Sequence, residues 1–161
     1  MIIIVMGVVG AGKTTVGRLL AERLHFEFAD ADDFHPAANV EKIRRGLALT
    51  DQDRKPWLER LHGAIAEWIA GGKNVVLACS ALKRSYRDEL AVGPQVRFVY
   101  LKGSAELIAE RLRARHGHFA GEAILASQLA DLEEPQGAAT VDIAATPENI
   151  VAEIRERLGL A

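Results

Sequence analysis

The chain has 161 residues, of which 49% are hydrophobic and 26% are charged, and its formal net charge at pH 7 is -2. This length predicts one domain with a buried core. The charge argues against broad nucleic-acid binding through a basic face, and no apolar run approaches the length that spans a bilayer. Cys79 is the only cysteine, so an intramolecular disulfide is excluded, as suits a reducing cytosol.

The N-terminal segment predicts a nucleotide site. Residues 2–6 are apolar and β-branched, as in a strand buried on both faces, and residues 13–24 have a helical pattern. Between them, residues 7–14 match G-x-x-x-x-G-K-[ST], and this context is typical of a phosphate-binding loop. Glycines let main-chain N–H groups turn toward an anion, and the helix N-terminus adds partial positive charge. The predicted nucleotide ligands are Gly7, Gly10, Ala11, Gly12, Lys13, Thr14 and Thr15.

Two side chains of this loop have more specific expected roles. Lys13 is expected to reach the β- and γ-phosphates of ATP, and the Thr14 hydroxyl is expected to ligate Mg²⁺. We count Lys13 among the catalytic residues because charge neutralisation around the γ-phosphate drives phosphoryl transfer.

Short apolar runs alternate with amphipathic stretches along the rest of the chain. Further strands are predicted at 26–29, 75–79, 96–101 and 141–144, and further helices at about 36–45, 56–70, 82–90, 105–115, 122–132 and 147–158. Such alternation predicts a parallel sheet with right-handed crossovers. The expected fold is therefore α/β, with three layers and a five-stranded parallel sheet flanked by helices.

An acidic pair follows the second predicted strand. Asp30 and Asp32 stand at its carboxyl end, where parallel sheets bind ligands, so both can face the glycine loop. We assign Asp32 to accept or orient the proton of an acceptor hydroxyl, and Asp30 to support the water shell of the metal. Which of the two faces the metal stays open. The alternative is a solvated acidic turn or a helix cap.

Arginines near the predicted helix at 105–115 suit phosphate. Arg111 and Arg115 are four residues apart and share a helix face. We assign both to the nucleotide, and Arg111 also to the developing charge, on a mobile cap that excludes water. The alternative is a solvated face paired with Glu106 and Glu110.

Other residues are open to two interpretations. His35 and His118 can each bind a polyhydroxy substrate, and a structural role is an equal alternative for either one. Trp57 and Trp68 are expected to pack in the core, and Cys79 is expected to be a small buried hydrophobe.

Several segments together resemble a known family. The residues that carry the resemblance are Met6-Gly7-Val8, Asp32-Asp33-Phe34-His35-Pro36 with Asn39 and Lys42, Gly46, Leu49, Asp51, Asp53-Arg54, Pro56-Trp57-Leu58, Cys79-Ser80-Ala81-Leu82-Lys83, Tyr86-Arg87, Tyr100-Leu101-Lys102-Gly103, Arg111, Arg115, Gly117-His118-Phe119, Ser127-Gln128 and Leu132-Glu133-Glu134-Pro135. On these segments the chain is similar to the small P-loop gluconokinases, which are related to shikimate kinases and nucleoside monophosphate kinases. The phosphate loop alone would name only a superfamily.

The resemblance implies a function and an anatomy. It implies ATP- and Mg²⁺-dependent phosphorylation of D-gluconate on its 6-hydroxyl, a cytoplasmic setting, a homodimer, and no membrane or nucleic-acid partner. It also implies one kinase domain over residues 1–161, with a short lid at about 112–125 and a substrate-binding helical segment at about 33–60. Its candidate substrate ligands are Asp32, His35, Arg54, Lys83, Arg87, His118 and Gln128, with Arg54 as the fork for the carboxylate.

The sequence departs from this family at two loop positions and leaves two other functions open. Val9 and Ala11 stand where the family often carries Ser, but main-chain N–H groups and Lys13 are expected to preserve phosphate binding. One alternative is a kinase of another small acceptor, such as shikimate or a nucleoside monophosphate. The other is a nucleotide-binding module without catalysis.

Overall fold

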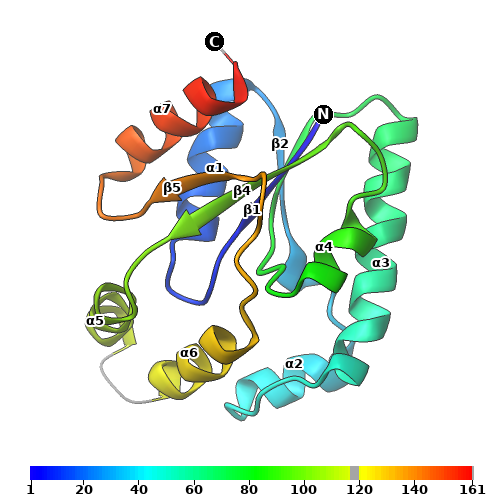
Figure 1. Cartoon of the computed structure of the whole chain (residues 1–161). Coiled ribbons are helices and arrows are strands. Elements are labelled where there is room, and N and C mark those ends of the chain that lie inside the picture. Colours follow the sequence, from blue (N-terminus) through cyan, green and yellow to red (C-terminus); the bar gives the residue numbers. More distant parts are fainter. Residues whose placement is uncertain (117–119, 161) are drawn as a thin grey trace.

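The chain folds into a five-stranded parallel sheet with helices on both faces (Figure 1). The computed structural model describes residues 1–116 and 120–160. The strands are β1 (Ile2–Met6), β2 (Glu27–Asp30), β3 (Val75–Ala78), β4 (Val96–Lys102) and β5 (Ala139–Asp142), in the order β2-β3-β1-β4-β5. The helices are α1 (Lys13–Leu24), the 3-10 helix η1 (Ala31–Phe34), α2 (Ala37–Arg44), α3 (Asp51–Ala70), α4 (Arg84–Leu90), α5 (Ala105–His116), α6 (Ala120–Asp131) and α7 (Pro147–Leu158). The predicted α/β fold is confirmed.

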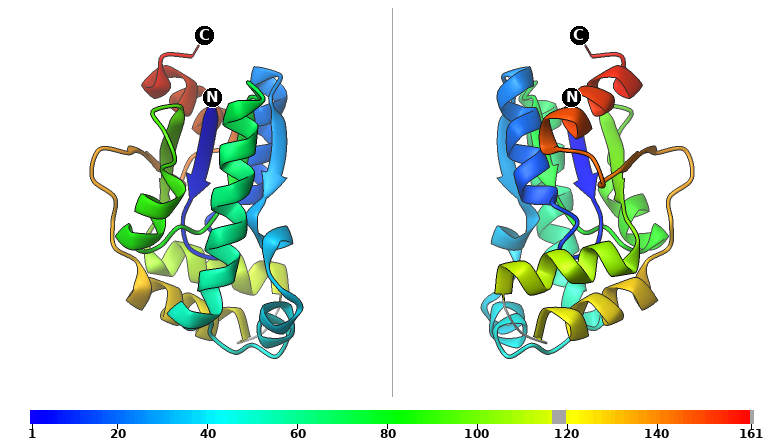
Figure 2. Two further views of the ribbon diagram at one scale, coloured as in Figure 1. Left: turned by 90° about the vertical axis from the view of Figure 1, so that its right-hand side faces the viewer. Right: turned by 90° about the vertical axis from the view of Figure 1, so that its left-hand side faces the viewer.

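The sheet separates two hydrophobic cores. Every side chain of β1 is fully buried, and alternate residues enter opposite cores because successive strand side chains point to opposite faces. Ile3 and Val5 pack in the core that contains residues of α1 and α7, whereas Ile4 packs in the core built by α3 and α4. Figure 2 shows these helix pairs on opposite faces of the sheet. Trp57 is 2% exposed, as expected of a core residue.

Helix α3 begins earlier than its sequence pattern suggests. Pro56 led us to expect a start near residue 56, yet the helix begins at Asp51. A capping box starts it there: the Asp53 N–H donates to Thr50 Oγ1 at 3.1 Å, and the Thr50 N–H donates to Asp53 Oδ2 at 2.9 Å. The early start brings Asp51 and Arg54 into the first turn of a helix that begins beside the functional edge of the sheet.

The last strand is also shifted relative to its predicted position. β5 begins at Ala139 because its register is set by β4, with Ala139 opposite Val99 and Asp142 opposite Lys102.

A short helix, η1, follows β2. The Asp30 carboxylate accepts the N–H of Asp32 at 3.0 Å and so caps η1, which the sequence pattern did not predict.

The topology gathers the loops that follow β1, β2 and β3 at one edge. β1 lies between β3 and β4, so the chain crosses from one side of β1 to the other after β3. Ligands of such sheets bind beyond the carboxyl ends of the strands near this switch point. Cys79, the residue after β3, is buried there, and burial raises the pKa of its thiol to about 12. In the described part of the chain, no helix is both long and apolar enough to cross a membrane.

Candidate active site

The phosphate loop connects β1 to α1 and has a conformation that requires glycine. Gly10 and Gly12 have φ angles of 83° and 94°, in the left-handed region that other residues seldom adopt. Gly12 directly precedes the first turn of α1, where no side chain caps the helix. The free N–H groups of that turn suit an anion.

Lys13 folds back over the loop. Its Nζ donates to the main-chain oxygen of Val8 at 3.0 Å. Desolvation lowers the pKa of Lys13, and the nearby carboxylate of Asp32 opposes that shift. The ammonium therefore lies at the mouth of the loop, within the field of an acidic group.

Thr14, Asp30 and Asp32 form an oxygen-rich group beside Lys13. Thr14 Oγ1 donates to Asp30 Oδ2 at 3.3 Å, so the two predicted metal ligands lie in contact. The pKa of Asp32 is raised, first by desolvation and then by the neighbouring negative charge of Asp30. A carboxylate with a raised pKa is a stronger base, which suits a group that accepts a proton.

These residues line one cavity of about 340 Å³. Its floor contains the phosphate loop and the acidic pair, and its other walls come from α2, the start of α3, the end of β3 and α6. Four predicted substrate ligands line it: Asp32, His35, Arg54 and Gln128. The structure therefore brings residues from widely separated parts of the chain to one site.

His35 is held as a neutral ring on the wall of the cavity. It stacks on Trp57 with a centroid distance of 4.6 Å, and Asn39 Nδ2 lies 3.2 Å from its Nδ1. Since an amide NH₂ only donates, Nδ1 accepts and Nε2 carries the proton. Burial, with a contribution from Arg54, lowers the pKa of His35 to about 4. The ring is thus neutral at pH 7, with a donor available for a hydroxyl oxygen.

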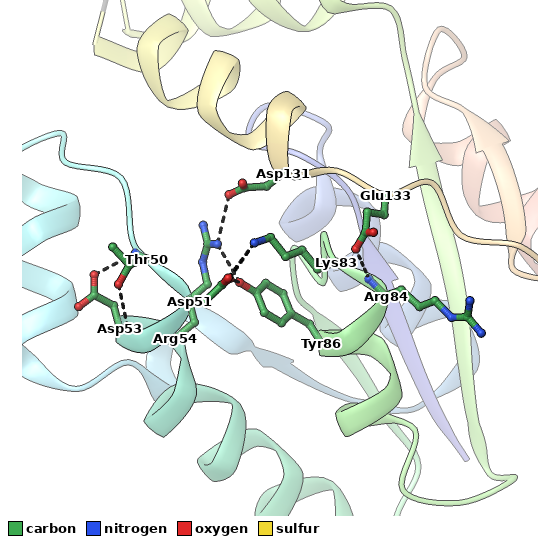
Figure 3. Close-up of polar contacts among 9 residues, drawn as sticks. All are labelled: Thr50, Asp51, Asp53, Arg54, Lys83, Arg84, Tyr86, Asp131 and Glu133. Atoms are coloured by element: carbon green, nitrogen blue, oxygen red, sulfur yellow. Dashed lines mark hydrogen bonds and ion pairs between the residues drawn. The ribbon is translucent and has the colours of Figure 1, made fainter.

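Arg54 presents a buried cation to the same cavity. Arg54 as a whole is 9% exposed. Its Nη1 donates to the Tyr86 hydroxyl at 3.0 Å and to Asp131 Oδ2 at 3.2 Å (Figure 3). Tyr86 in turn donates to Asp51. The guanidinium is therefore fixed by partners from α4 and α6.

The remaining nucleotide and substrate candidates lie around the phosphate loop. Gln128 Oε1 accepts the N–H of Val9 at 2.6 Å, so α6 contacts the loop directly. Arg115 lines the main cavity and also a neighbouring cavity of about 220 Å³, which Arg111 and Gly10 help to line. Arg111 Nη2 donates to the main-chain oxygen of Ile143 at 2.6 Å.

Two predicted substrate ligands, Lys83 and Arg87, do not line the main cavity, and their assignment stays a prediction. Lys83 Nζ donates to both carboxylate oxygens of Asp51, at 2.8 and 3.0 Å. Arg87 donates to the main-chain oxygens of Ala81, Leu82 and Glu133, so the main chain uses this guanidinium. Both side chains hold the protein frame around the cavity. His118 lies outside the described residues.

Sequence reasoning missed several residues of the site. Ile43 and Leu47 line the cavity and are 42% and 52% exposed; they lie in the predicted substrate-binding segment but were not singled out as ligands. Tyr86 and Asp131 hold Arg54 from 32 and 77 residues away. A spacing of three residues on α6 places Asp131 one turn after Gln128, and this was the only available signal.

Comparisons with known proteins identify the family. A family model described as an AAA domain matches residues 2–135. The gluconokinase of Gluconobacter oxydans (strain 621H) is 48% identical over 134 residues, which cover 83% of this chain and 75% of that protein. The structure of a gluconokinase from Sinorhizobium meliloti 1021 is 44% identical in sequence, with a TM-score of 0.87, and the match covers 98% of this chain and 90% of that chain. The unliganded structure of a sugar kinase from Janibacter sp. HTCC2649 is 40% identical in sequence, with a TM-score of 0.91, and the match covers 99% of this chain and 95% of that chain.

The fold and the phosphate loop define an α/β P-loop kinase, a class that binds ATP. Within that class, the chain belongs to the gluconokinase family.

Proposed function

We propose that this chain transfers the γ-phosphoryl group of ATP to the 6-hydroxyl of D-gluconate, giving 6-phospho-D-gluconate and ADP. The observation that carries the proposal is the fixed guanidinium of Arg54 in the cavity that also holds the phosphate loop and Asp32. A buried cation with unused donors selects an acceptor that carries a carboxylate. Membership of the gluconokinase family supplies the particular acid.

The acid end of the substrate binds to Arg54 in this proposal. A charge-assisted hydrogen bond contributes about 1.5–3 kcal/mol, enough to favour an acid over a neutral sugar of the same shape. His35 Nε2 donates to a hydroxyl of the polyol chain, because its other ring nitrogen is occupied by Asn39. The two contacts orient the chain of the acid along the cavity.

The hydroxyl at the other end of the acid reacts with ATP. Asp32 accepts the hydroxyl proton, and the hydroxyl oxygen bonds to the γ-phosphorus while the bond to the bridging oxygen of ADP breaks. Lys13 exchanges the Val8 carbonyl for the phosphates and neutralises their charge. Arg111 and Arg115, beside the smaller cavity, stabilise the rest of the nucleotide.

Mg²⁺ is part of the proposal, and the residues fit it. Thr14 and Asp30 offer hard oxygen donors in contact with each other next to the loop. Mg²⁺ usually keeps several waters and takes one or two protein ligands plus substrate phosphates. Among the described residues, no group of three or more His, Cys, Asp or Glu is placed to hold a metal ion. When bound, the ion neutralises charge on the phosphate oxygens.

The family resemblance supports three further parts of the proposal. These are a homodimer, a cytoplasmic location, and a lid at about residues 112–125 that closes over the nucleotide. The lid region includes residues 117–119, outside the described part of the chain.

A coupled assay tests the proposal. Purified protein, Mg-ATP and D-gluconate are mixed with 6-phosphogluconate dehydrogenase, which reports only the 6-phosphorylated acid through NADPH. We expect ATP-dependent NADPH formation. No signal with gluconate, together with turnover of shikimate or a nucleoside monophosphate in a parallel acceptor screen, contradicts the substrate assignment. No turnover of any acceptor, with ATP binding intact, favours a non-catalytic module.

A further inference from the structure

Side chains from three helices meet at Arg54. α3 carries Arg54, α4 carries Tyr86, and Asp131 is the last residue of α6. Figure 3 shows Asp131 pointing from the end of α6 toward the guanidinium. The Arg54 side chain is 11% exposed, so these partners contribute strongly to the stability of its charge.

The hydrogen bonds at Tyr86 have a fixed direction. A hydroxyl has one hydrogen, and that of Tyr86 is donated to Asp51, so its oxygen accepts from Arg54. Lys83 binds both oxygens of Asp51 and balances that charge. Tyr86 and Asp131 therefore both act as acceptors toward Arg54, and both use the same nitrogen, Nη1.

The opposite edge of Arg54 is available to a ligand. Within residues 1–116 and 120–160, Nε and Nη2 have no protein hydrogen-bond acceptor. The described residues contain no buried side-chain nitrogen or oxygen that lacks a partner, so these donors are open to the cavity that Arg54 lines. An Nε–Nη2 edge binds a carboxylate through two parallel hydrogen bonds.

We propose that Asp131 is a positioning residue, which holds Arg54 so that its Nε–Nη2 edge faces the carboxylate of the acid substrate. The inference rests on the proposed function, because it assigns a role at the same site. Asp131 is itself fixed to the frame: the Glu133 N–H donates to Leu82 O at 2.8 Å, and Arg87 Nη2 donates to Glu133 O at 2.7 Å. The chain just beyond Asp131 is thus tied to the segment before α4.

Two effects of Asp131 on the acid have opposite signs. Its negative charge repels a second carboxylate nearby, whereas its hydrogen bond aligns the guanidinium that attracts the acid. We expect alignment to dominate, because Arg54 is buried and the loss of Asp131 leaves Tyr86 as its only acceptor among the described residues. Removing one partner of a buried charged pair leaves that charge uncompensated.

The same helix reaches the phosphate loop, which provides a control. Gln128 lies one turn before Asp131 and accepts the Val9 N–H at 2.6 Å. Replacing Gln128 loosens α6 at the phosphate loop without touching Arg54. Gln128→Ala should therefore raise the KM for ATP, a change that Asp131→Ala should not produce.

The experiment compares steady-state constants of the wild type, Asp131→Ala, Arg54→Ala and the double variant, with gluconate and with neutral gluconamide as acceptors. We expect Asp131→Ala to raise the KM for gluconate about 10- to 100-fold, as for a lost charged hydrogen bond. Its kcat and its KM for ATP should stay within about threefold, a range that corresponds to well under 1 kcal/mol. The KM for gluconamide should not change, and the double variant should match Arg54→Ala.

Other outcomes overturn the proposal. An unchanged KM for gluconate in Asp131→Ala shows that Asp131 does not position Arg54 for the acid, and a lower KM shows that its repulsion of the acid dominates. An equal rise for gluconamide, or an additive loss in the double variant, shows a general structural role. Asp131→Asn keeps an acceptor for Arg54 and replaces the alanine variant if that one does not fold.

Failure of the proposed function gives a different result. In that case the wild type does not phosphorylate gluconate, and the same four proteins are compared with the acceptor that the screen identifies. A preference of the wild type for a neutral acceptor overturns the role of Asp131 as well. If the screen identifies another acid, the comparison of the double variant with Arg54→Ala decides whether Asp131 positions Arg54.

Discussion

The two halves of the active site are built in different ways. The phosphate side is one contiguous loop, residues 7–14, whose geometry depends on the main chain and on glycines with positive φ. The acid side is assembled from side chains between Asp32 and Asp131, carried by η1, α3, α4 and α6. The first half should therefore respond to changes of backbone conformation, and the second to changes of single functional groups.

The largest effect is expected where the two halves meet, at Asp32. Asp32→Asn keeps the size of the side chain but removes the base, so kcat should fall about 10²- to 10⁴-fold. The affinity for ATP, measured by titration with a non-hydrolysable analogue, should change little. An unchanged kcat would remove Asp32 from its proposed role.

Two glycines test the main-chain half. The Cβ of an alanine at position 10, in place of Gly10, would lie 2.8 Å from Leu112 Cγ, and the residue would have to keep a φ of 83°. Gly10→Ala should therefore lower the free energy of unfolding by about 1–3 kcal/mol and weaken ATP binding. Gly63, in the interior of α3, has nothing within 4 Å of its Cβ position, so Gly63→Ala should stabilise the protein by about 0.5–1 kcal/mol. Urea denaturation measures both, and equal responses would contradict the backbone argument.

The two tyrosines test the side-chain half. Tyr86→Phe removes an uncharged acceptor from Arg54 and should raise the KM for gluconate about 2- to 10-fold, the value of an ordinary hydrogen bond. Tyr100 is buried to a similar degree, 5% against 6% exposed, but among the described residues it is not one of the acceptors of Arg54. Tyr100→Phe is therefore the matched control and should leave this KM unchanged. Equal effects of both variants would indicate loss of core packing rather than of positioning.

The smallest effect is a pH dependence of stability at His35. Its pKa in the folded protein, about 4, lies below its ordinary value of 6.5, so the unfolded chain takes up the proton first as the pH falls. The free energy of unfolding should decrease between about pH 6.5 and 4, by up to about 1 kcal/mol at pH 5.5 after allowance for partial exposure. His35→Asn should lack this part of the decrease in urea titrations at pH 7.5 and 5.5. The same pH dependence in the variant would contradict the assignment.

The contrast between the halves also explains what the sequence could predict. The phosphate loop was predictable because its ligands are adjacent and its strand and helix have clear patterns. The start of α3 was not, because Pro56 obscured the capping box formed by Thr50 and Asp53. The register of β5 depends on its pairing with β4, which the pattern of one strand does not contain.

The partners of Arg54 show the same limit. Arg54 was predicted as a ligand, but Tyr86 and Asp131 are distant in sequence, and only the packing of α4 and α6 brings them to it. Lys83 and Arg87 were predicted as ligands from the family resemblance of their segments. The ammonium group of Lys83 binds Asp51, and the guanidinium of Arg87 binds main-chain oxygens. A sequence pattern does not reveal that these protein groups compete for the donors.

The burial of Cys79 makes this protein convenient for site-specific spectroscopy. Its thiol is shielded and stays protonated at neutral pH, so alkylating dyes should not react with it in the folded state. A cysteine introduced at exposed Ala126 on α6 would then be the one reactive thiol, with no need to remove the native one. A fluorophore attached there would report whether α6 moves during turnover in an otherwise wild-type chain.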